Sequence, residues 1–337
     1  MSKIAPKAKT SILFSGLDIL KFVLAIMVMD IHLGASTALP EVVQKGVIEP
    51  LHYMRVPVFF LISSFFLFKK VHEGPNPLTG LKRFLKRILT LYTFWVVVWM
   101  PYIIVKKPYF SSGWEGPLLY LRDFFLGEVF GNSWFLGALI TGSIIIFLLS
   151  RVVSDRIWWI LPVGIFAYGR LIPMLPDEWA VGNVWWLEFT GKSMYLSFPY
   201  NLMWITLGYY LAKPSMRDRM EKYTTRWRWL VFPAIILCIN PMSVTSLVTI
   251  PVATVSCFAA FYTWRPGISR ESSTWLRRAC TLFYVQHGTL EKVFRVHLHW
   301  EHGPVLFAAV FAICLTWTSL ILYLAKKPRF TWLRWAY

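Results

Sequence analysis

Long apolar blocks recur along the whole chain, separated by short polar segments rich in Pro and Gly. Most blocks approach the ~20 residues that a helix needs to cross a hydrocarbon core ~30 Å thick. The apolar segment 117–130 is too short for this and predicts an interfacial or re-entrant piece. Asn240-Pro241 must form a tight turn between two blocks. The pattern predicts an all-α bundle of about ten transmembrane helices, at residues 16–34, 52–68, 88–105, 133–150, 157–172, 194–212, 229–241, 243–264, 279–298 and 304–325.

The distribution of Lys and Arg predicts the orientation of this bundle. With the N-terminus inside, 25 of the 35 Lys and Arg residues fall on the inner side, nine lie at or near the outer ends, and Lys21 lies within a span. Cytoplasmic loops carry such an excess of positive charge. We therefore expect both termini in the cytoplasm, with short tails at about 1–15 and 326–337. No internal repeat or detached soluble domain is visible, so residues 1–337 are expected to form a single transmembrane domain.

Composition agrees with a membrane protein and indicates which kinds of partner to expect. Hydrophobic residues make up 56% of the chain, charged residues 15%, and mean hydropathy is +0.52, whereas soluble domains carry more charge. Topology explains the net charge of +18, so membrane lipid is the expected partner and nucleic acid is not. The four cysteines show no ligand spacing, so no metal site or disulfide framework is predicted. The first apolar run contains Asp18 and Lys21 and lacks a clean cleavage site, so we expect an uncleaved helix rather than a signal peptide.

The first predicted span carries polar residues that are costly within a bilayer. Lys21 and His32 are eleven residues apart, about three helical turns, so they share a face and lie roughly 16 Å apart along the axis. Asp18, one turn before Lys21, can pair with it, whereas Asp30 points to the opposite side. Charged groups inside a span usually face a cavity or a partner. A histidine at this place fits a general base and fits equally a hydrogen-bonded residue at a helix end.

Several segments accompany this stripe in a fixed order along the chain. They are Leu17-Asp18-Ile19-Leu20-Lys21 with His32, Val56-Pro57-Val58-Phe59-Phe60-Leu61-Ile62-Ser63-Ser64, the basic run Lys82-Arg83-Phe84-Leu85-Lys86-Arg87, Ser133-Trp134-Phe135-Leu136 and Phe283-Tyr284-Val285-Gln286-His287. Together they resemble the acyltransferase-3 family of bacterial integral membrane acyltransferases, with its Lys/Arg-x10-His, P-x-F-F-x-x-S-G, basic, WFL and Tyr-x-x-His elements. Ser64 replaces the usual Gly, and Arg83 with Lys86 or Arg87 replaces an Arg-x-x-Arg element.

The resemblance implies roles for nine residues. It makes His32, Lys21 and Asp18 the catalytic set, with His32 acting as a base or in direct acyl transfer and Lys21 and Asp18 holding the electrostatics of the stripe. It makes Arg83, Lys86 and Arg87 the cations that bind the phosphates of an acyl-CoA donor, acetyl-CoA first among the candidates. It adds three residues as further cavity or acceptor positions: Trp134, Tyr284 and His287.

Simpler interpretations stand beside these roles. The basic run 82–87 fits a topology signal, because cytoplasmic loops are expected to be positive. Trp134 fits an interfacial anchor, which is the commoner use of Trp at the end of a span. His287 fits a neutral, hydrogen-bonded histidine within its span.

The resemblance implies an O-acyltransferase of the bacterial plasma (inner) membrane that acts on a cell-envelope glycan or lipid-linked sugar. The competing function is a proton-coupled transporter or glycan flippase, because intramembrane Asp, Lys and His also form proton relays. Transporters often contain repeats and matched broken helices, which this sequence does not show. The predicted topology places the donor-binding cations and His32 toward opposite faces of the bilayer, so the donor arm must thread a cavity or the acyl group must be relayed.

Overall fold

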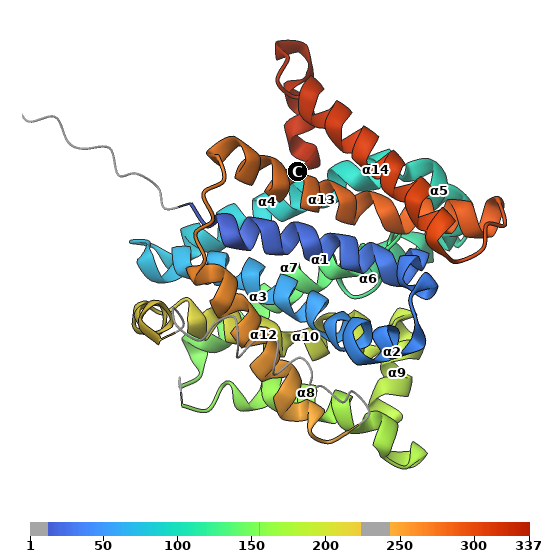
Figure 1. Ribbon diagram of the computed structural model, residues 1–337. Helices are drawn as coiled ribbons and strands as arrows, with labels where there is room; N and C mark the ends of the chain where they lie inside the picture. The colour runs from blue at the N-terminus through green and yellow to red at the C-terminus, as the bar shows by residue number, and fades with distance from the viewer. Residues whose placement is uncertain (1–12, 155, 224–242) are drawn as a thin grey trace, which may run out of the picture.

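The computed structural model describes residues 13–154, 156–223 and 243–337, and within these ranges it contains helices and no β-strand. Many of the longer helices lie side by side and run along a similar line (Figure 1). The α-helices are α1 Ser15–Leu33, α2 Glu41–Val43, α3 Glu49–Glu73, α4 Pro77–Val98, α5 Met100–Lys106, α6 Gly116–Phe125, α7 Trp134–Val152, α8 Ile160–Leu171, α9 Val181–Thr190, α10 Phe198–Leu211, α12 Ser246–Thr263, α13 Arg270–Lys292 and α14 Pro304–Leu324.

Within the described residues, four helical segments are long and apolar enough to cross a bilayer: Glu41–Glu73, which includes α3, and the helices α7, α12 and α14. The pair α4 and α5 becomes a fifth if it is counted as one span, although it is bent by 69°. The bend falls at Trp99, just before Pro101, whose ring cannot continue the hydrogen-bonding pattern of α4. These segments coincide with five of the ten predicted spans.

The other predicted spans differ in length or charge. Helices α1 and α13 have 19 and 23 residues but carry charged residues along their length. Helices α8 and α10 have 12 and 14 residues, which correspond to roughly 18 and 21 Å of the ~30 Å core. The span at 229–241 and its Asn240-Pro241 turn lie outside the described residues. The count of ten spans and the cytoplasmic position of the termini therefore stay predictions.

Three segments differ from the sequence-based expectation. The helix that contains the predicted span 52–68 begins at Glu41 and continues through a π-helical turn to Glu73. Helix α9 was not predicted, and it exposes Trp185 and Phe189. The segment 326–337 is more than a tail, because it forms a 3-10 helix, Pro328–Ala336, that packs against α4. The indole Nε1 of Trp95 donates a 3.0 Å hydrogen bond to the Ala336 carbonyl.

Local signals in the sequence set several of these helix ends. Asn76 caps α4 by accepting a 2.9 Å hydrogen bond from the Leu78 N–H, with Pro77 at the first helical position. Ser269 caps α13 in the same way through the Ser272 N–H. Gly34 ends α1 with a φ of +85°, and an added Cβ there would lie 2.5 Å from His302. A glycine is required there for both reasons.

Three helices establish how the centre of the molecule is arranged. Ser273 of α13 donates a 2.6 Å hydrogen bond to Asp18 near the start of α1, and the His32 and His287 rings meet near the ends of the two helices. Helices α1 and α13 are therefore parallel and in register. Helix α3 runs antiparallel to α1, because Phe14 meets Phe66 at one end and Asp30 meets His52 at the other.

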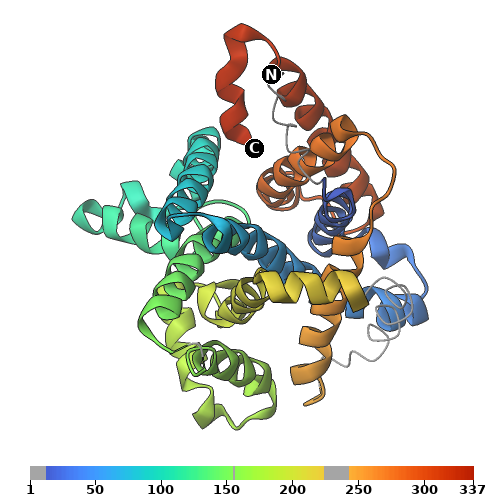
Figure 2. The ribbon, with the colours of Figure 1, turned by 90° about the vertical axis from the view of Figure 1, so that its left-hand side faces the viewer.

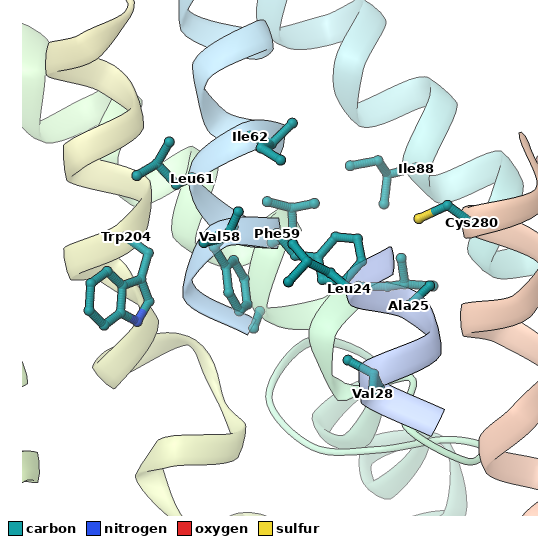
Figure 3. Close-up of a cluster of buried hydrophobic side chains, with 14 of the residues drawn as sticks. Leu24, Ala25, Val28, Val58, Phe59, Leu61, Ile62, Ile88, Trp204 and Cys280 are labelled. Atoms are coloured by element: carbon teal, nitrogen blue, oxygen red, sulfur yellow. The ribbon is translucent and has the colours of Figure 1, made fainter. Parts of the chain in front are cut away.

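Buried side chains from α1, α3, α4, α10 and α13 pack against one another between these helices (Figure 3). Figure 2, turned by 90°, shows α1 and α13 together on one side of α3 and α4 on its other side. Helix α10 packs closely on α3, since a Cβ added at Gly208 would lie 1.9 Å from the Ser64 hydroxyl. The small residue at position 64 thus serves helix packing, as expected where two membrane helices approach closely.

Candidate active site

A cavity of about 800 Å³ lies between α1, α3, α4, α7 and α13. Its volume falls in the range of sites for small molecules and cofactors. Ile62, Ile88 and Cys280 come from three different helices and point toward a shared space (Figure 3). The middle of the cavity is apolar, lined by Val28, Phe59, Ile62, Ile88, Leu91, Leu136, Leu139 and Cys280. The charged lining residues gather at the two ends.

One end of the cavity, which we call the basic end, is lined by six cationic side chains: Lys21, Lys70, Arg83, Arg87, Arg270 and Arg277. Within the described part of the chain, Asp18 is the one carboxylate that lines the cavity beside them. Arg83 and Arg87 are one turn apart on α4 and share a face. A smaller hollow of about 240 Å³ adjoins this end, and Arg87 and Arg277 line both. The basic end is suited to binding a polyanion.

Asp18 at the basic end is buried, with 5% of its surface exposed. It accepts the 2.6 Å hydrogen bond from Ser273 and lies 4.0 Å from the Arg277 guanidinium. The expected pairing of Asp18 with Lys21 is wrong, because α13 packs beside α1 and supplies both partners. Within the described residues, Lys21 forms no hydrogen bond or ion pair, and its side chain lines the cavity.

The opposite end, which we call the His32 end, contains His32 and a group of fixed polar residues. The ring centroids of His32 and the fully buried His287 are 5.5 Å apart. His287 donates from Nδ1 to the Phe283 carbonyl at 2.9 Å and accepts at Nε2 from the Asn132 amide at 3.0 Å. Both ring nitrogens of His287 are therefore engaged, and its imidazole is neutral. His32 is the histidine that lines the cavity.

The loop that follows α6 is held against α13 by close backbone contacts. Gly131 and Gly288 face each other, and a Cβ added at Gly131 would lie 2.3 Å from the Gly288 carbonyl carbon. Asn132 has a φ of +62°, a left-handed conformation that Asn tolerates better than most residues. Tyr284 donates a hydrogen bond to the Asn132 carbonyl. These contacts fix the amide that orients His287.

Glu128, in the same loop, forms the centre of an ion-pair network at the His32 end. Its carboxylate is 4% exposed and pairs with both Lys192 and Lys292. Burial alone raises the pKa of Glu128, but the ammonium groups of Lys292 and Lys192 lower it, and the resulting pKa lies below its usual value. Lys192 is held in a turn that the Thr190 hydroxyl and Gly191, at a φ of +67°, form at the end of α9.

The structure brings seven of the nine predicted site residues to this one cavity: Asp18, Lys21, His32, Arg83, Arg87, Trp134 and Tyr284. Lys86 is exposed on α4 and does not line the cavity. His287 lies behind His32 and also does not line it. Trp134 is buried against Phe60, which does not fit an interfacial anchor. Asp30 faces away, as predicted, and pairs with His52.

Sequence reasoning missed several charged and polar residues of the cavity. The missed residues of the basic end are Lys70, Arg270 and Arg277, and those of the His32 end are Arg55, Glu128, Asn132, Lys192, Glu291 and Lys292. Arg55 and Glu128 lie within otherwise apolar stretches, and this is the same signal that marks Asp18, Lys21 and His32 in the sequence. The others occur in polar segments where nothing in the sequence distinguishes them.

A family model of the acyltransferase domain matches residues 14–324, nearly the whole chain. The chain belongs to the acyltransferase-3 family. No curated protein and no solved structure matches the chain. The family and the apolar helices together identify a membrane acyltransferase, in agreement with the order of motifs along the sequence.

Proposed function

We propose that this acyltransferase moves an acyl group, acetyl in the first instance, from acyl-CoA to a hydroxyl of a cell-envelope glycan or lipid-linked sugar. The observation that carries the proposal is the single cavity that joins the basic end to His32 through an apolar middle. Acyl-CoA has the matching distribution of chemistry, with a phosphate-bearing nucleotide at one end, a long flexible arm and a reactive thioester at the other.

The donor phosphates bind at the basic end in this proposal. Arg83 and Arg87 can both face one phosphate, and hydrogen bonds from ionised donors are about twice as strong as neutral ones. Arg277, shared by the cavity and the adjoining hollow, extends the cationic surface beyond α4. Lys86 is left out of donor binding, because it does not line the cavity.

The pantetheine arm then follows the apolar middle toward His32. Lys21 and His32 are roughly 16 Å apart along α1, so an extended arm is needed to span the distance between them. Threading the arm answers the problem that the phosphate-binding cations and His32 lie at opposite ends. No appended domain is required to relay the acyl group.

His32 acts on the acceptor hydroxyl at the far end of the cavity. Its neutral imidazole takes the hydroxyl proton as the oxygen attacks the thioester carbonyl. The tetrahedral intermediate collapses with formation of the ester C–O bond and cleavage of the C–S bond, and the proton passes from His32 to the leaving thiolate. Direct transfer through an acylated His32 gives the same products. His287, fixed by Asn132, keeps the neighbouring ring in place.

The proposed location is the plasma membrane of a bacterium, with the basic end toward the cytoplasm. Acyl-CoA is a cytoplasmic metabolite, and the excess of Lys and Arg on the inner segments supports the same orientation. His32 would then lie toward the outer face, where envelope glycans and lipid-linked sugars are presented.

The function is tested with purified protein in detergent, acetyl-CoA and a mixture of envelope glycans, with release of free CoA thiol and of acetylated product measured separately. The His32→Ala variant should lose transfer by about 100-fold or more, as expected when a general base is removed. His297→Ala is the matched control, because His297 is exposed and lies outside the cavity. Unchanged transfer in His32→Ala would overturn the mechanism, and glycan movement without acetylation would favour a flippase.

A further inference from the structure

Arg55 is a charged residue at the His32 end that forms no ion pair or hydrogen bond within the part of the chain that the structure describes. It lies on α3, lines the cavity, and its Nη1 atom is buried without a hydrogen-bond partner. An unpaired buried guanidinium is costly, and buried charges in proteins are usually paired or bind a ligand. The position of Arg55 therefore suits an anion that the described residues do not supply.

The carboxylates near Arg55 have other partners. Glu128 is shared between Lys192 and Lys292, and Glu291 pairs with Arg295 at 3.0 Å. The single negative charge of Glu128 is thus shared by the ammonium groups of Lys192 and Lys292, and Arg55 adds a third positive charge. Asp30 acts on Arg55 electrostatically and accepts a 3.2 Å hydrogen bond from His52, but it forms no ion pair or hydrogen bond with Arg55 itself. The His32 end has an excess of positive charge.

The excess charge lies next to the catalytic position. Arg55, Glu128 and Lys292 are all close enough to His32 for their charges to act on its ring. Arg55 and Lys70 are 15 residues apart on α3, or roughly 22 Å along the helix. The donor phosphates at the basic end cannot reach Arg55 at the same time, so the anion must belong to the acceptor.

We propose that the acceptor carries an anionic group, a phosphate or a carboxylate, beside the hydroxyl that is acylated, and that Arg55 binds this group. This inference rests on the proposed acyl transfer to a sugar hydroxyl and narrows it to anionic acceptors. The planar guanidinium suits the role, because it binds phosphate or carboxylate through two parallel hydrogen bonds.

Binding is tested first, without any acyl transfer. Melting of the detergent-solubilised protein is followed with glucose 1-phosphate, glucuronate, inorganic phosphate and glucose as probes. The two anionic sugars should raise the melting temperature and glucose should not, and the stronger of the two identifies phosphate or carboxylate as the preferred group. Equal effects of glucose and both anionic sugars on the wild-type protein would overturn the proposal, whatever the variants do.

Variants then locate the binding site. Arg55→Gln should raise the apparent Kd of the preferred anionic sugar at least tenfold, and Arg55→Lys should restore part of the affinity. Lys45→Gln removes an exposed cation outside the cavity, and Lys70→Gln removes one from the basic end. Both should bind the probe as the wild type does. Loss of binding in Lys70→Gln with none in Arg55→Gln would place the anion at the donor site and reject the proposal.

Transfer kinetics distinguish two roles for Arg55. It could bind the acceptor, or it could stabilise the reaction intermediate. With acetyl-CoA as donor, Arg55→Gln should raise KM for the anionic sugar at least tenfold and leave KM for acetyl-CoA within about twofold. An equal fall of kcat for anionic and neutral acceptors would show the other role and overturn the proposal. Arg55-dependent binding in a protein that transfers no acyl group would contradict the proposed function but not the anion site.

Discussion

The two ends of the cavity are both rich in cations, but they use them differently. Among the described residues, six cations and the carboxylate of Asp18 line the basic end, and Asp18 is itself hydrogen-bonded to Ser273. At the His32 end Lys192 and Lys292 form ion pairs with Glu128, whereas Arg55 forms no ion pair with any described residue. Cations that are paired inside the protein hold the structure together, whereas Lys21 and Arg55, which form no ion pair within the described residues, are available to an anionic ligand. Both ends are thus basic, but we expect them to bind anions of very different charge.

The two ends also differ in how the chain builds them. Regular helices carry the basic end, with Arg83 and Arg87 on an exposed face of α4. The His32 end depends on the loop between α6 and α7, where the Ser133 hydroxyl accepts hydrogen bonds from the Val129 and Phe130 N–H groups at 3.0 and 3.1 Å. Substitutions at the basic end should therefore affect ligand binding, and many at the His32 end should affect folding as well.

The largest effect is the loss of folding stability that we expect from Glu128→Gln. Removing one partner of a buried ion pair costs about 3–5 kcal/mol, and here it leaves two ammonium groups without a carboxylate. The loss should appear as a lower midpoint in thermal unfolding in detergent. Glu41→Gln is the control, since Glu41 pairs with Lys45 at an exposed site, where an ion pair contributes about 0–1 kcal/mol.

The ion pairs of Glu128 also predict how the stability of the folded protein depends on pH. Because the pKa of folded Glu128 lies below its usual value of 4.5, its stabilising effect is complete above that value. It is lost as pH falls through the lower, folded pKa. Wild-type stability should therefore fall more steeply in acid than that of Glu128→Gln. Parallel curves would show that the Glu128 network does not stabilise the His32 end.

The next largest effect is expected from blocking the apolar middle. Ile62→Trp places a large side chain where Ile62, Ile88 and Cys280 converge (Figure 3), while Ile62→Ala widens the passage. Ile62→Trp should reduce transfer by about 100-fold, because the thioester no longer reaches His32. Donor binding at the basic end should persist, and Ile62→Ala should retain most of the activity. Equal activities in the two variants would mean that the two ends do not communicate through the cavity.

The apolar and polar patterns predicted the helical class. Four of the spans, or five if the bent pair α4 and α5 counts as one, coincide with described helices that are long and apolar enough to cross a bilayer. Periodicity gave the positions of helices but not their ends, because caps such as Asn76 and Ser269 act locally. It also missed α9, whose apolar residues show no long block.

The candidate site was predictable where its residues lie on one helix and not where several helices meet. The spacing of Lys21 and His32 on α1 placed both at the cavity, as the periodicity of a helix requires. The partners of Asp18 come from α13, more than 250 positions later, and no local rule gives them. Glu128, Lys192 and Lys292 belong to three separate segments for the same reason.

Neighbouring cations on α4 give a sharper test of the basic end. Consecutive residues of a helix are about 100° apart, and Arg87 lines the cavity whereas Lys86 does not. Arg87→Ala should weaken acetyl-CoA binding by about tenfold or more, since a hydrogen bond to a charged group contributes about 1.5–3 kcal/mol. Lys86→Ala should change it less than about twofold. Similar losses in the two variants would indicate a diffuse electrostatic effect of the whole basic run.

The smallest expected effect concerns Asn132, which orients His287 behind His32. Asn132→Gly removes the amide but keeps a residue that accepts the φ of +62° without strain, so the loop should remain folded. Loss of one hydrogen bond to a neutral group costs about 0.5–1.5 kcal/mol, so kcat should fall severalfold to about tenfold. KM for acetyl-CoA should stay the same, because the basic end is untouched. A change in that KM with constant kcat would show that the loop shapes the donor path instead of the His32 end.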